Sequence, residues 1–506
     1  MGVVQRQGVS STVISYIGAV LGYVNKMVLF THFLSLEEVG LANTMPVIAV
    51  MIAQFAAIGT PNSILRFFPY FRDREKHHNG FLAGFLLLSL IGFIVIGSLF
   101  WIFRPFIFSI WEEKSPLLFE YGYLLLPYAL SYVVINVFEA YLRSLYKIAF
   151  MTFVKEIGLR LAVTIAISLF AFGVIDFSTF VHIYIAVIVL TAVAPVLYTL
   201  FIGELLLKPQ FGTVWKKHFN EIIRYTFVTF LPIAGSTVLH QLDIFMLSFE
   251  SETLNGIYTT LAFAATIIVI PWKALRGISA PLVVEHWKNK DMEKMKSLYR
   301  RTSLISLMTG TFIFLGLWLN RHNLIAIIGE KYAIGIIVLA ILGLSKVWDM
   351  TTGLNGVILI TSPKYIYDLF FQIGLIVIGI SSNLILIPRL GINGAAIATF
   401  VSIFFINTAR MITVWRLFNL HPFTDPMLKV VVGGILTYYI CDAFPTLVNF
   451  WWDIPLRSFL CTVLFAGLML KWEVSPDVNA YVMKWGAKFG VGRILQFLIN
   501  TDREKD

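Results

Sequence analysis

Residues 12–33, TVISYIGAVLGYVNKMVLFTHF, have a counterpart in residues 225–249, YTFVTFLPIAGSTVLHQLDIFMLSF. Gly18 and Gly235 are 217 positions apart (235 minus 18), and so are Lys26 and Asp243 (243 minus 26). The same offset relates four pairs of charged residues in corresponding loops: Arg104 and Arg321, Glu113 and Glu330, Lys114 and Lys331, and Lys147 and Lys364. Identities at one offset arise by chance in apolar sequence, so the matching loops carry more weight. Together they indicate a tandem duplication.

The rest of the chain is apolar segment after apolar segment. A bilayer core takes about 20 apolar residues per helix. About fourteen stretches of that length occur, with boundaries good to about two to four residues: 12–33, 40–64, 81–103, 117–142, 150–172, 179–203, 225–249, 254–275, 302–320, 333–358, 365–387, 393–415, 427–446 and 456–471. Each copy of the repeat holds six of them, and an even number gives both copies the same orientation.

Composition agrees with this reading. Of the 506 residues 58% are hydrophobic and only 13% are charged, so a soluble globule would expose much of its apolar surface to water. We therefore expect an all-α integral membrane protein with about 14 transmembrane helices, in which two parallel six-helix repeats form lobes around a midplane cleft. The expected parts are an N-terminal lobe (1–210), a C-terminal lobe (211–420), helices 13 and 14 (421–475) and a cytoplasmic tail (476–506).

The net charge of +10 is distributed by topology. Lysine and arginine gather in alternate loops, such as those after helices 2, 4, 6 and 8, whereas the intervening loops are short and poor in base. By the positive-inside rule both termini are cytoplasmic. The tail, over residues 478–500, has the pattern of an interfacial amphipathic helix, with contact to a cytoplasmic partner as the alternative.

Several classes of protein are disfavoured. No cytoplasmic insertion is long enough for a nucleotide-binding or glycosyltransferase domain, and no Walker A spacing occurs, so transport driven by the chain's own ATP hydrolysis is not expected. Cys441 and Cys461 fall in late predicted helices and indicate no disulfide framework. The first apolar segment lacks a small-residue cleavage site and is interpreted as retained.

Charged residues inside apolar segments are the first candidates for function, because a charge in the bilayer costs at least a few kcal/mol. Lys26 and Asp243 lie at matching depths in helices 1 and 7. They are candidates for a gate or coupling pair at the outer mouth of the cleft. The alternative is that each is satisfied within its own lobe, with Lys26 extending to the interface. His240, one turn before Asp243, is a candidate to share its proton, or else an ordinary hydrogen-bonded helix residue.

A second charged pair lies in helix 10. Lys346 and Asp349 are spaced i, i+3, so they share a helix face and can neutralise each other. As a site, Lys346 would bind an anionic substrate group while Asp349 sets its charge or exchanges a proton. Trp348 and Asn355 could contact sugar rings. The alternative is a local pair facing a wet cavity, with Trp348 as packing.

A third set of cations lies near the predicted inner ends of helices 2, 4, 5 and 8. Arginine suits phosphate oxygens, so these residues are candidates to receive a diphosphate headgroup. Positive-inside topology places bases there in any case, and Glu139, Glu156 and Asp368 could pair with them. The set comprises Arg66, Arg143, Arg160, Lys273 and Arg276.

Five segments carry a family resemblance: 33–41 (FLSLEEVGL), 241–247 (QLDIFML), 256–258 (GIY), 329–333 (GEKYA) and 388–399 (PRLGINGAAIAT). Over residues 5–420 the chain resembles the polysaccharide-transport branch of the MOP superfamily, the Wzx-like oligosaccharide-lipid flippases, distant relatives of MATE exporters and lipid II flippases. The resemblance implies a flippase of the bacterial inner membrane that moves a polyprenyl-diphosphate-linked oligosaccharide to the outer leaflet by alternating access.

The resemblance also implies the type of cargo and site. The glycan would be an O-antigen unit of lipopolysaccharide, a capsule unit or another surface-polysaccharide repeat. Lys26 and Lys346 match a cationic cavity, with possible Na⁺ or H⁺ coupling, no other cofactor and no metal site. A polysaccharide polymerase or other assembly protein is a candidate partner. The deep bases here are few and most have a nearby acid, so a zwitterionic or weakly charged glycan remains open.

Two other functions compete with this one. A cation-coupled exporter of drugs or other amphiphiles would have the same fold, with a narrower and more acidic cavity. A membrane glycan polymerase or ligase usually needs a sizeable outer loop with catalytic arginine or histidine, and the outer loops here are short. We therefore expect a transporter without catalytic residues.

Overall fold

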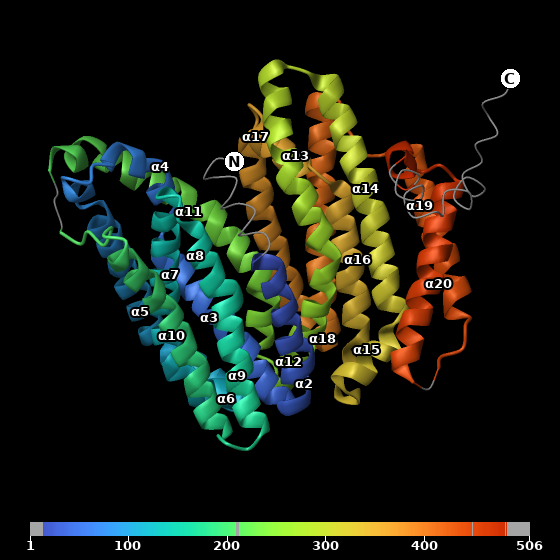
Figure 1. The fold of residues 1–506 in the computed structure, drawn as a ribbon, viewed down its shortest axis with the longest axis horizontal. Helices are drawn as coiled ribbons and strands as arrows, with labels where there is room; N and C mark the ends of the chain where they lie inside the picture. Colours follow the sequence, from blue (N-terminus) through green and yellow to red (C-terminus); the bar gives the residue numbers. More distant parts are fainter. Residues whose placement is uncertain (1–13, 209–211, 448, 481, 483–506) are drawn as a thin grey trace. The chain divides into compact units, whose positions relative to one another are not determined.

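The computed structural model describes residues 14–208, 212–447, 449–480 and 482. This part of the chain is helical and contains no strand (Figure 1). It divides into two compact units, Met1–Thr260 and Leu261–Asp506. The expected lobe boundaries at residues 210, 420 and 475 stay predictions, and the tail predicted over 478–500 lies almost wholly outside the described residues.

Unit 1 comprises the helices up to the first turns of α12. They are η1 (Val24–Leu29), α2 (Phe30–Phe33), α3 (Leu36–Ala57), α4 (Thr60–Phe71), η2 (His77–Gly80), α5 (Phe81–Lys114), α6 (Pro116–Tyr121), η3 (Gly122–Leu124), α7 (Leu125–Ser144), α8 (Ile148–Phe153), η4 (Val154–Gly158), α9 (Leu159–Ala171), α10 (Phe177–Phe201), α11 (Thr213–Leu247) and α12 (Glu252–Ala265).

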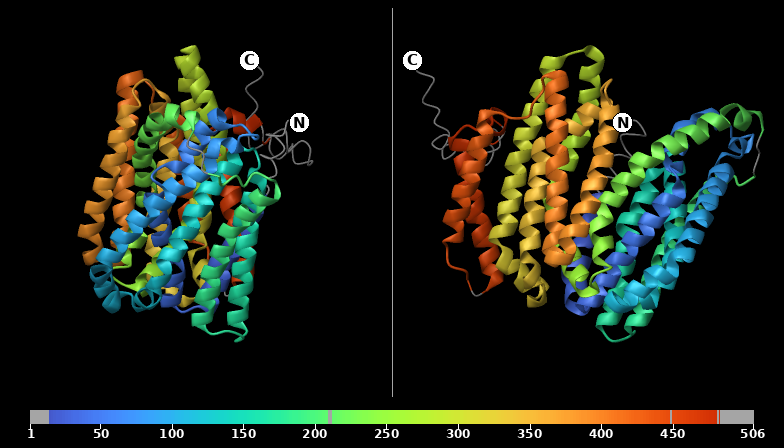
Figure 2. Two further views of the ribbon diagram at one scale, coloured as in Figure 1. Left: turned by 90° about the vertical axis from the view of Figure 1, so that its left-hand side faces the viewer. Right: turned by 180° about the vertical axis from the view of Figure 1, so that it is seen from behind.

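Unit 2 holds the remaining helices. They are η5 (Thr266–Val269), α13 (Ile270–Asn289), α14 (Met292–Leu319), α15 (Arg321–Ile328), η6 (Glu330–Gly335), α16 (Ile336–Thr352), α17 (Asn355–Thr361), α18 (Ile366–Phe418), α19 (Asp425–Asp442) and α20 (Phe450–Lys471). Within this unit, α19 and α20 lie side by side (Figure 2).

Ten helices of the described part are long and apolar enough to cross a membrane. The predicted count of about fourteen is not confirmed by this measure. One reason is that α18 covers two predicted spans, 365–387 and 393–415, which meet at Gly391. There the backbone has φ 55° and ψ −132°, a conformation that glycine adopts most readily, so the chain turns without an intervening loop.

Local sequence explains where several helices begin. Ser35 caps α3: its hydroxyl accepts from the Glu38 backbone N–H at 3.2 Å, and the Glu38 carboxylate accepts from the Ser35 N–H at 2.7 Å. This capping box satisfies two backbone donors at the helix start. Asp176 similarly caps α10 by accepting from the Thr179 N–H at 3.0 Å. The pKa of Asp176 is lowered because Thr179 hydrogen-bonds its charged form.

The core of unit 1 is rich in large aromatic side chains. Trp111 and Tyr128 are completely buried among residues of α3, α7 and α10. A second cluster joins α4, α5 and α7 to the start of α11, where Trp215 packs on Phe71 with ring centroids 5.0 Å apart. Such aromatic pairs stabilise beyond the area they bury. The first turns of α11 are therefore part of this unit's packing.

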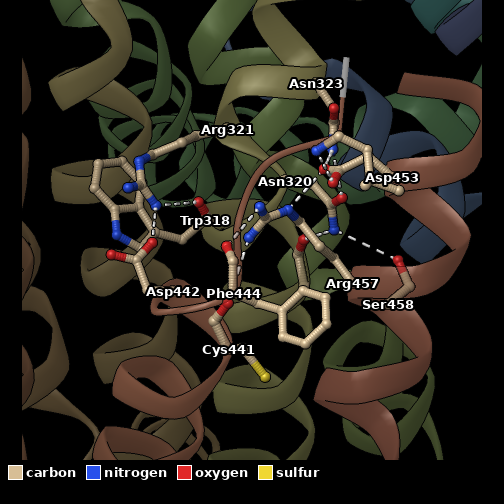
Figure 3. A network of polar contacts seen from close by, with 12 residues as sticks. Trp318, Asn320, Arg321, Asn323, Cys441, Asp442, Phe444, Asp453, Arg457 and Ser458 are labelled. Atoms are coloured by element: carbon tan, nitrogen blue, oxygen red, sulfur yellow. Dashed lines mark hydrogen bonds and ion pairs between the residues drawn. The ribbon is translucent and has the colours of Figure 1, made fainter. Parts of the chain in front are cut away.

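Polar contacts fasten α19 and α20 to α15 within unit 2 (Figure 3). Arg457 donates to the backbone oxygens of Cys441 and Phe444, which lie at and just beyond the end of α19. Asp453 accepts from Asn323 at 2.6 Å and from the Leu447 N–H at 2.9 Å. Buried polar groups need such partners. The two C-terminal helices are thus an integral part of unit 2.

Candidate functional site

Lys26 lies in a π-helical turn, η1, which packs against α9, the predicted helix 5. The neighbouring Asn25 fixes that contact: its amide donates to the Arg160 backbone oxygen at 2.8 Å and accepts from the Thr164 hydroxyl at 2.7 Å. A Cβ at Gly22 would lie 3.0 Å from Arg160 Nη1, so the two segments approach closely. The facing segment also contains a π turn, η4. Such turns are frequent at functional sites.

Two of the predicted cations have acidic partners in the same region. Glu139 pairs with Arg143 at 3.0 Å and with Lys155 at 2.7 Å, so one carboxylate on α7 serves two bases. Arg160 pairs with Glu156 at 2.7 Å. The pairing that the sequence offered as an alternative is therefore present for Arg143 and Arg160. Lys155 is a member of this cluster that sequence reasoning missed, because its distance of sixteen residues from Glu139 gives no helical signal.

The other predicted cations are more exposed. Arg66 pairs with Glu221 of α11 at 3.3 Å and lies 4.2 Å from the centroid of the Tyr225 ring. Lys273 and Arg276 are exposed on α13 of unit 2. The five residues proposed for a diphosphate site are thus divided between two units.

Asp243 has a partner that the sequence did not suggest. The hydroxyl of Tyr258 on α12 donates to its carboxylate at 2.6 Å, and Tyr258 is buried. The proposed gate of Lys26 with Asp243 stays a prediction. The side chain of His240, the third member of that hypothesis, lies outside the described residues.

In unit 2 the polar site on α16 is built differently from the predicted i, i+3 pair. Asn407 of α18 donates to Asp349 at 2.7 Å, and Asn355 donates to the Asn407 backbone oxygen at 3.2 Å. Among the ion pairs of the described residues, Lys346 with Asp349 does not occur. The amide carbonyl of Asn355 accepts from the Gly356 N–H at 2.5 Å. Asn355 is buried, so it orders the start of α17 and the Asp349 site.

A buried ion pair lies within α18, the helix that also carries Asn407. Arg410 and Asp368 are joined at 2.8 Å, and their side chains are only 11% and 9% exposed. They come from the two arms of α18, on either side of Gly391. Asp368 was considered as a partner for the inner-mouth cations, and the structure pairs it with Arg410. Two charges buried in this way require each other, because removal of one leaves the other unsatisfied.

An apolar groove of about 1200 Å³ lies beside this polar site. It is bounded by α14, α16, α18 and α19, all in unit 2. Its walls include Phe314, Val347, Trp348, Phe404 and Val431. Residues on one face of α16 thus line the groove, whereas Lys346 and Asp349 lie on another face. Sequence reasoning gave helices 13 and 14 no role and missed the groove.

A family profile described as "Polysaccharide biosynthesis protein" matches residues 4–280, more than half of the chain. This chain is a member of that family. The capsular polysaccharide biosynthesis protein CapF of Staphylococcus aureus is 24% identical over 198 residues, which are 37% of this chain. The matched part spans 50% of the length of that relative.

Solved structures show the fold of this family member. It is similar to an inward closed conformation of the lipid II flippase MurJ, with a TM-score of 0.71, 14% identity, and coverage of 92% of this chain and 99% of the other. An inward-facing multidrug resistance MATE transporter of the MOP superfamily gives a TM-score of 0.63 at 16% identity, over 80% of this chain and 94% of the other. The expected MOP-superfamily fold is confirmed, and the chain is a multi-pass membrane protein.

Proposed function

We propose that this protein is a flippase that moves a polyprenyl-diphosphate-linked oligosaccharide from the cytoplasmic to the outer leaflet by alternating access. Membership of the polysaccharide biosynthesis family supports a role in building a surface glycan. The observation that carries the proposal is the two-faced helix α16. Its groove side offers an apolar surface for a lipid chain, and another face carries Lys346 and Asp349, the latter hydrogen-bonded to Asn407.

The groove suits a long hydrocarbon chain. Burying a CH₂ group contributes about 0.8 kcal/mol, so a chain of many isoprene units gains binding energy from any apolar channel that it fills. The Lys346 ammonium offers three donors to a phosphate or an acidic sugar. In this proposal the lipid and its polar group use different faces of one helix.

The remaining parts of the proposal follow from this role. The protein lies in the bacterial inner membrane with both termini cytoplasmic, transports without catalysing a reaction, and takes its driving force from an ion gradient. A glycan polymerase acting on the translocated product is the expected partner.

The deciding experiment is mass spectrometry of membrane lipids from cells that lack the gene, with an assay of leaflet. A polyprenyl-diphosphate glycan trapped in the inner leaflet supports the flippase and names its cargo. The second candidate, an amphiphile exporter, is favoured by the likeness to the MATE transporter. An unchanged lipid pool with increased sensitivity to amphipathic cations would support that candidate.

A matched pair of variants tests the groove. Val431 lines it, whereas the adjacent Val432 is similarly exposed but does not line it. We expect Val431→Trp to fill the groove and reduce binding of the lipid-linked glycan, and Val432→Trp to leave it unchanged. Equal effects of the two variants would remove the groove from the proposal.

A further inference from the structure

Helices α3 and α12 meet at two glycines within unit 1. A Cβ at Gly40 would lie 2.4 Å from the Glu252 backbone oxygen, and a Cβ at Gly256 would lie 2.2 Å from the Leu36 backbone oxygen. These are backbone contacts that no other residue type could make without a shift of the helices. The two helix starts therefore press directly on each other.

The contact is reciprocal. Gly40 and Gly256 are 216 positions apart (256 minus 40), and so are the carbonyls that they touch, those of Leu36 and Glu252 (252 minus 36). Each copy of the repeat thus applies its glycine to the equivalent carbonyl of the other copy. This is the local geometry of a two-fold interface. The offset is one residue shorter than the 217 positions that relate the first helices of the two copies.

Polar side chains extend the same relationship. We call the residues through which α3 and α12 contact each other, glycines and polar residues together, the seam. The Thr253 hydroxyl donates to the Glu37 carboxylate at 2.6 Å. Deeper in the pair, the Asn43 amide donates to the Thr259 hydroxyl at 3.2 Å. Both hydrogen bonds join residues 216 positions apart. Because the side chains are polar, water can replace these contacts when the helices separate.

Asn255 and Thr44 complete the seam. The Asn255 amide donates to the Thr44 hydroxyl at 2.9 Å, and both residues are buried. Charge topology places this end of the helices on the outer side of the membrane. Separation of α3 from α12 would therefore admit outer water to residues that are now dry.

Glu252 is the member of the seam that combines an incompletely satisfied side chain with an ionisable group, since Asn43 and Asn255, whose carbonyl oxygens also lack a hydrogen bond, cannot titrate. It is 2% exposed. One carboxylate oxygen accepts from the Leu117 N–H of α6 at 3.0 Å. The other, Oε1, is buried without a hydrogen bond. The mechanism proposed above does not use this residue.

The charged surroundings of Glu252 do not compensate a negative charge. Glu37 is the carboxylate that faces it from α3, and α6 contributes backbone N–H groups and no side-chain cation. At the end of α5, Lys114 pairs with Glu113 at 3.4 Å. Glu250, on its own turn, is exposed. A buried carboxyl with one unsatisfied oxygen and a neighbouring carboxylate favours its neutral form.

We propose that Glu252 is a proton-binding site that holds the seam closed when protonated and releases its proton to outer water when the seam opens. The proton binds to Oε1, and no other bond changes. The role of this site rests on the proposed transport function, because the site would couple the outward-opening step of transport to pH. A falling outer pH thus favours the closed seam and a rising pH favours the open one.

The test measures seam opening without any substrate. Thr44→Cys places a thiol at a position that is 1% exposed. We would follow its modification by a membrane-impermeant maleimide added from outside, with the unsubstituted chain as the blank, because Cys441 and Cys461 are buried. The symmetry-related Thr260→Cys, also buried, serves as a second reporter if the first variant folds poorly.

The quantity to compare is the modification rate of the reporter that retains Glu252, divided at each pH by the rate of the same reporter with Glu252→Gln. This ratio removes the pH dependence of the thiol chemistry itself. The ratio should rise with pH by up to about tenfold per unit, the limit for one proton. Glu252→Asp should retain a rise. The neighbouring exposed residue gives the control: a reporter with Glu250→Gln should show the same pH dependence as the reporter that retains Glu250 and Glu252.

A ratio that is flat across pH in both reporters would overturn the proton site. That outcome leaves the flippase proposal intact, because the latter depends on which lipid accumulates in cells that lack the gene. Conversely, an unchanged lipid pool together with a pH-dependent ratio would remove the glycan cargo and retain Glu252 as the proton site of a different transporter.

Discussion

Arg457 donates its Nε hydrogen to Asp453 at 2.6 Å across one turn of α20, and the two side chains are only 3% and 2% exposed. The pair also holds the end of α19 through the carbonyls that Arg457 reaches. We expect Arg457→Leu to destabilise the protein by about 3 to 5 kcal/mol, because it leaves a buried carboxylate without its cation. Thermal unfolding in detergent measures this.

The double change Arg457→Leu with Asp453→Leu controls for lost packing. It should recover much of the stability, since no buried charge remains. If the double variant is as unstable as the single one, the network serves chiefly to satisfy the carbonyls of Cys441 and Phe444.

Gly256→Ala should destabilise the seam. The new Cβ would lie 2.2 Å from the Leu36 oxygen, which belongs to backbone and cannot turn aside, so we expect a loss of about 1 to 3 kcal/mol typical of overpacking. Gly467→Ala in α20 is the matched control, because nothing lies within 4 Å of its Cβ. That variant should leave stability unchanged or raise it slightly. Equal melting temperatures for the two variants would contradict the close contact.

Lys346→Ala should weaken binding of an anionic lipid-linked glycan. Loss of a hydrogen bond to a charged group is worth about 1.5 to 3 kcal/mol, which corresponds to roughly a tenfold or greater change in Kd. Lys364→Ala, at an exposed position, should have no effect. Native mass spectrometry of the purified protein with the extracted lipid measures both. Unchanged affinity for Lys346→Ala would move the anion site elsewhere.

Charge exchange tests the predicted gate. Lys26→Asp or Asp243→Lys alone should abolish transport, and the double swap should restore part of it if the residues pair during the cycle. Tyr258→Phe is a necessary companion, because Asp243 accepts a hydrogen bond from Tyr258 in this conformation. Loss of transport in Tyr258→Phe without rescue in the double swap would assign Asp243 to its tyrosine and remove the gate.

His421 gives a pH dependence of stability. It lies between α18 and α19, and burial together with Arg300 and Lys296 lowers its pKa from 6.5. The folded state therefore binds this proton less readily than the unfolded state, so stability is full above pH 6.5 and falls as the pH drops below that value. Unfolding curves for the protein and for His421→Gln should diverge below pH 6.5. Parallel curves would exclude His421 as the cause.

The sequence predicted those features that depend on neighbours along the chain. The duplication, the apolar helices and the acidic partners of Arg143 and Arg160 follow from offset, hydropathy and i, i+4 spacing. The start of α3 after Ser35 is also encoded locally, by the capping box, although the predicted span began at residue 40. Such features need no knowledge of which helices meet.

Contacts between distant segments could not be predicted in this way. Asn407 reaches Asp349 across 58 residues, and Asp368 meets Arg410 only because Gly391 reverses the chain between them. The i, i+3 spacing favoured Lys346 as the partner of Asp349, whereas the hydrogen bond to Asp349 in the structure comes from Asn407 of another helix. The groove has the same origin, because its walls belong to four helices and no single one of them carries its pattern.

The reciprocal contact of Gly40 and Gly256 has a consequence for how this gene can change. A tandem duplication normally frees each copy to diverge, since each meets its own selection. Here a larger side chain in either copy would clash with the backbone of the other. The close approach of α3 and α12 therefore constrains both positions at once. A substitution at Gly40 or Gly256 is therefore expected to need a compensating change in the other copy, so the two positions evolve together.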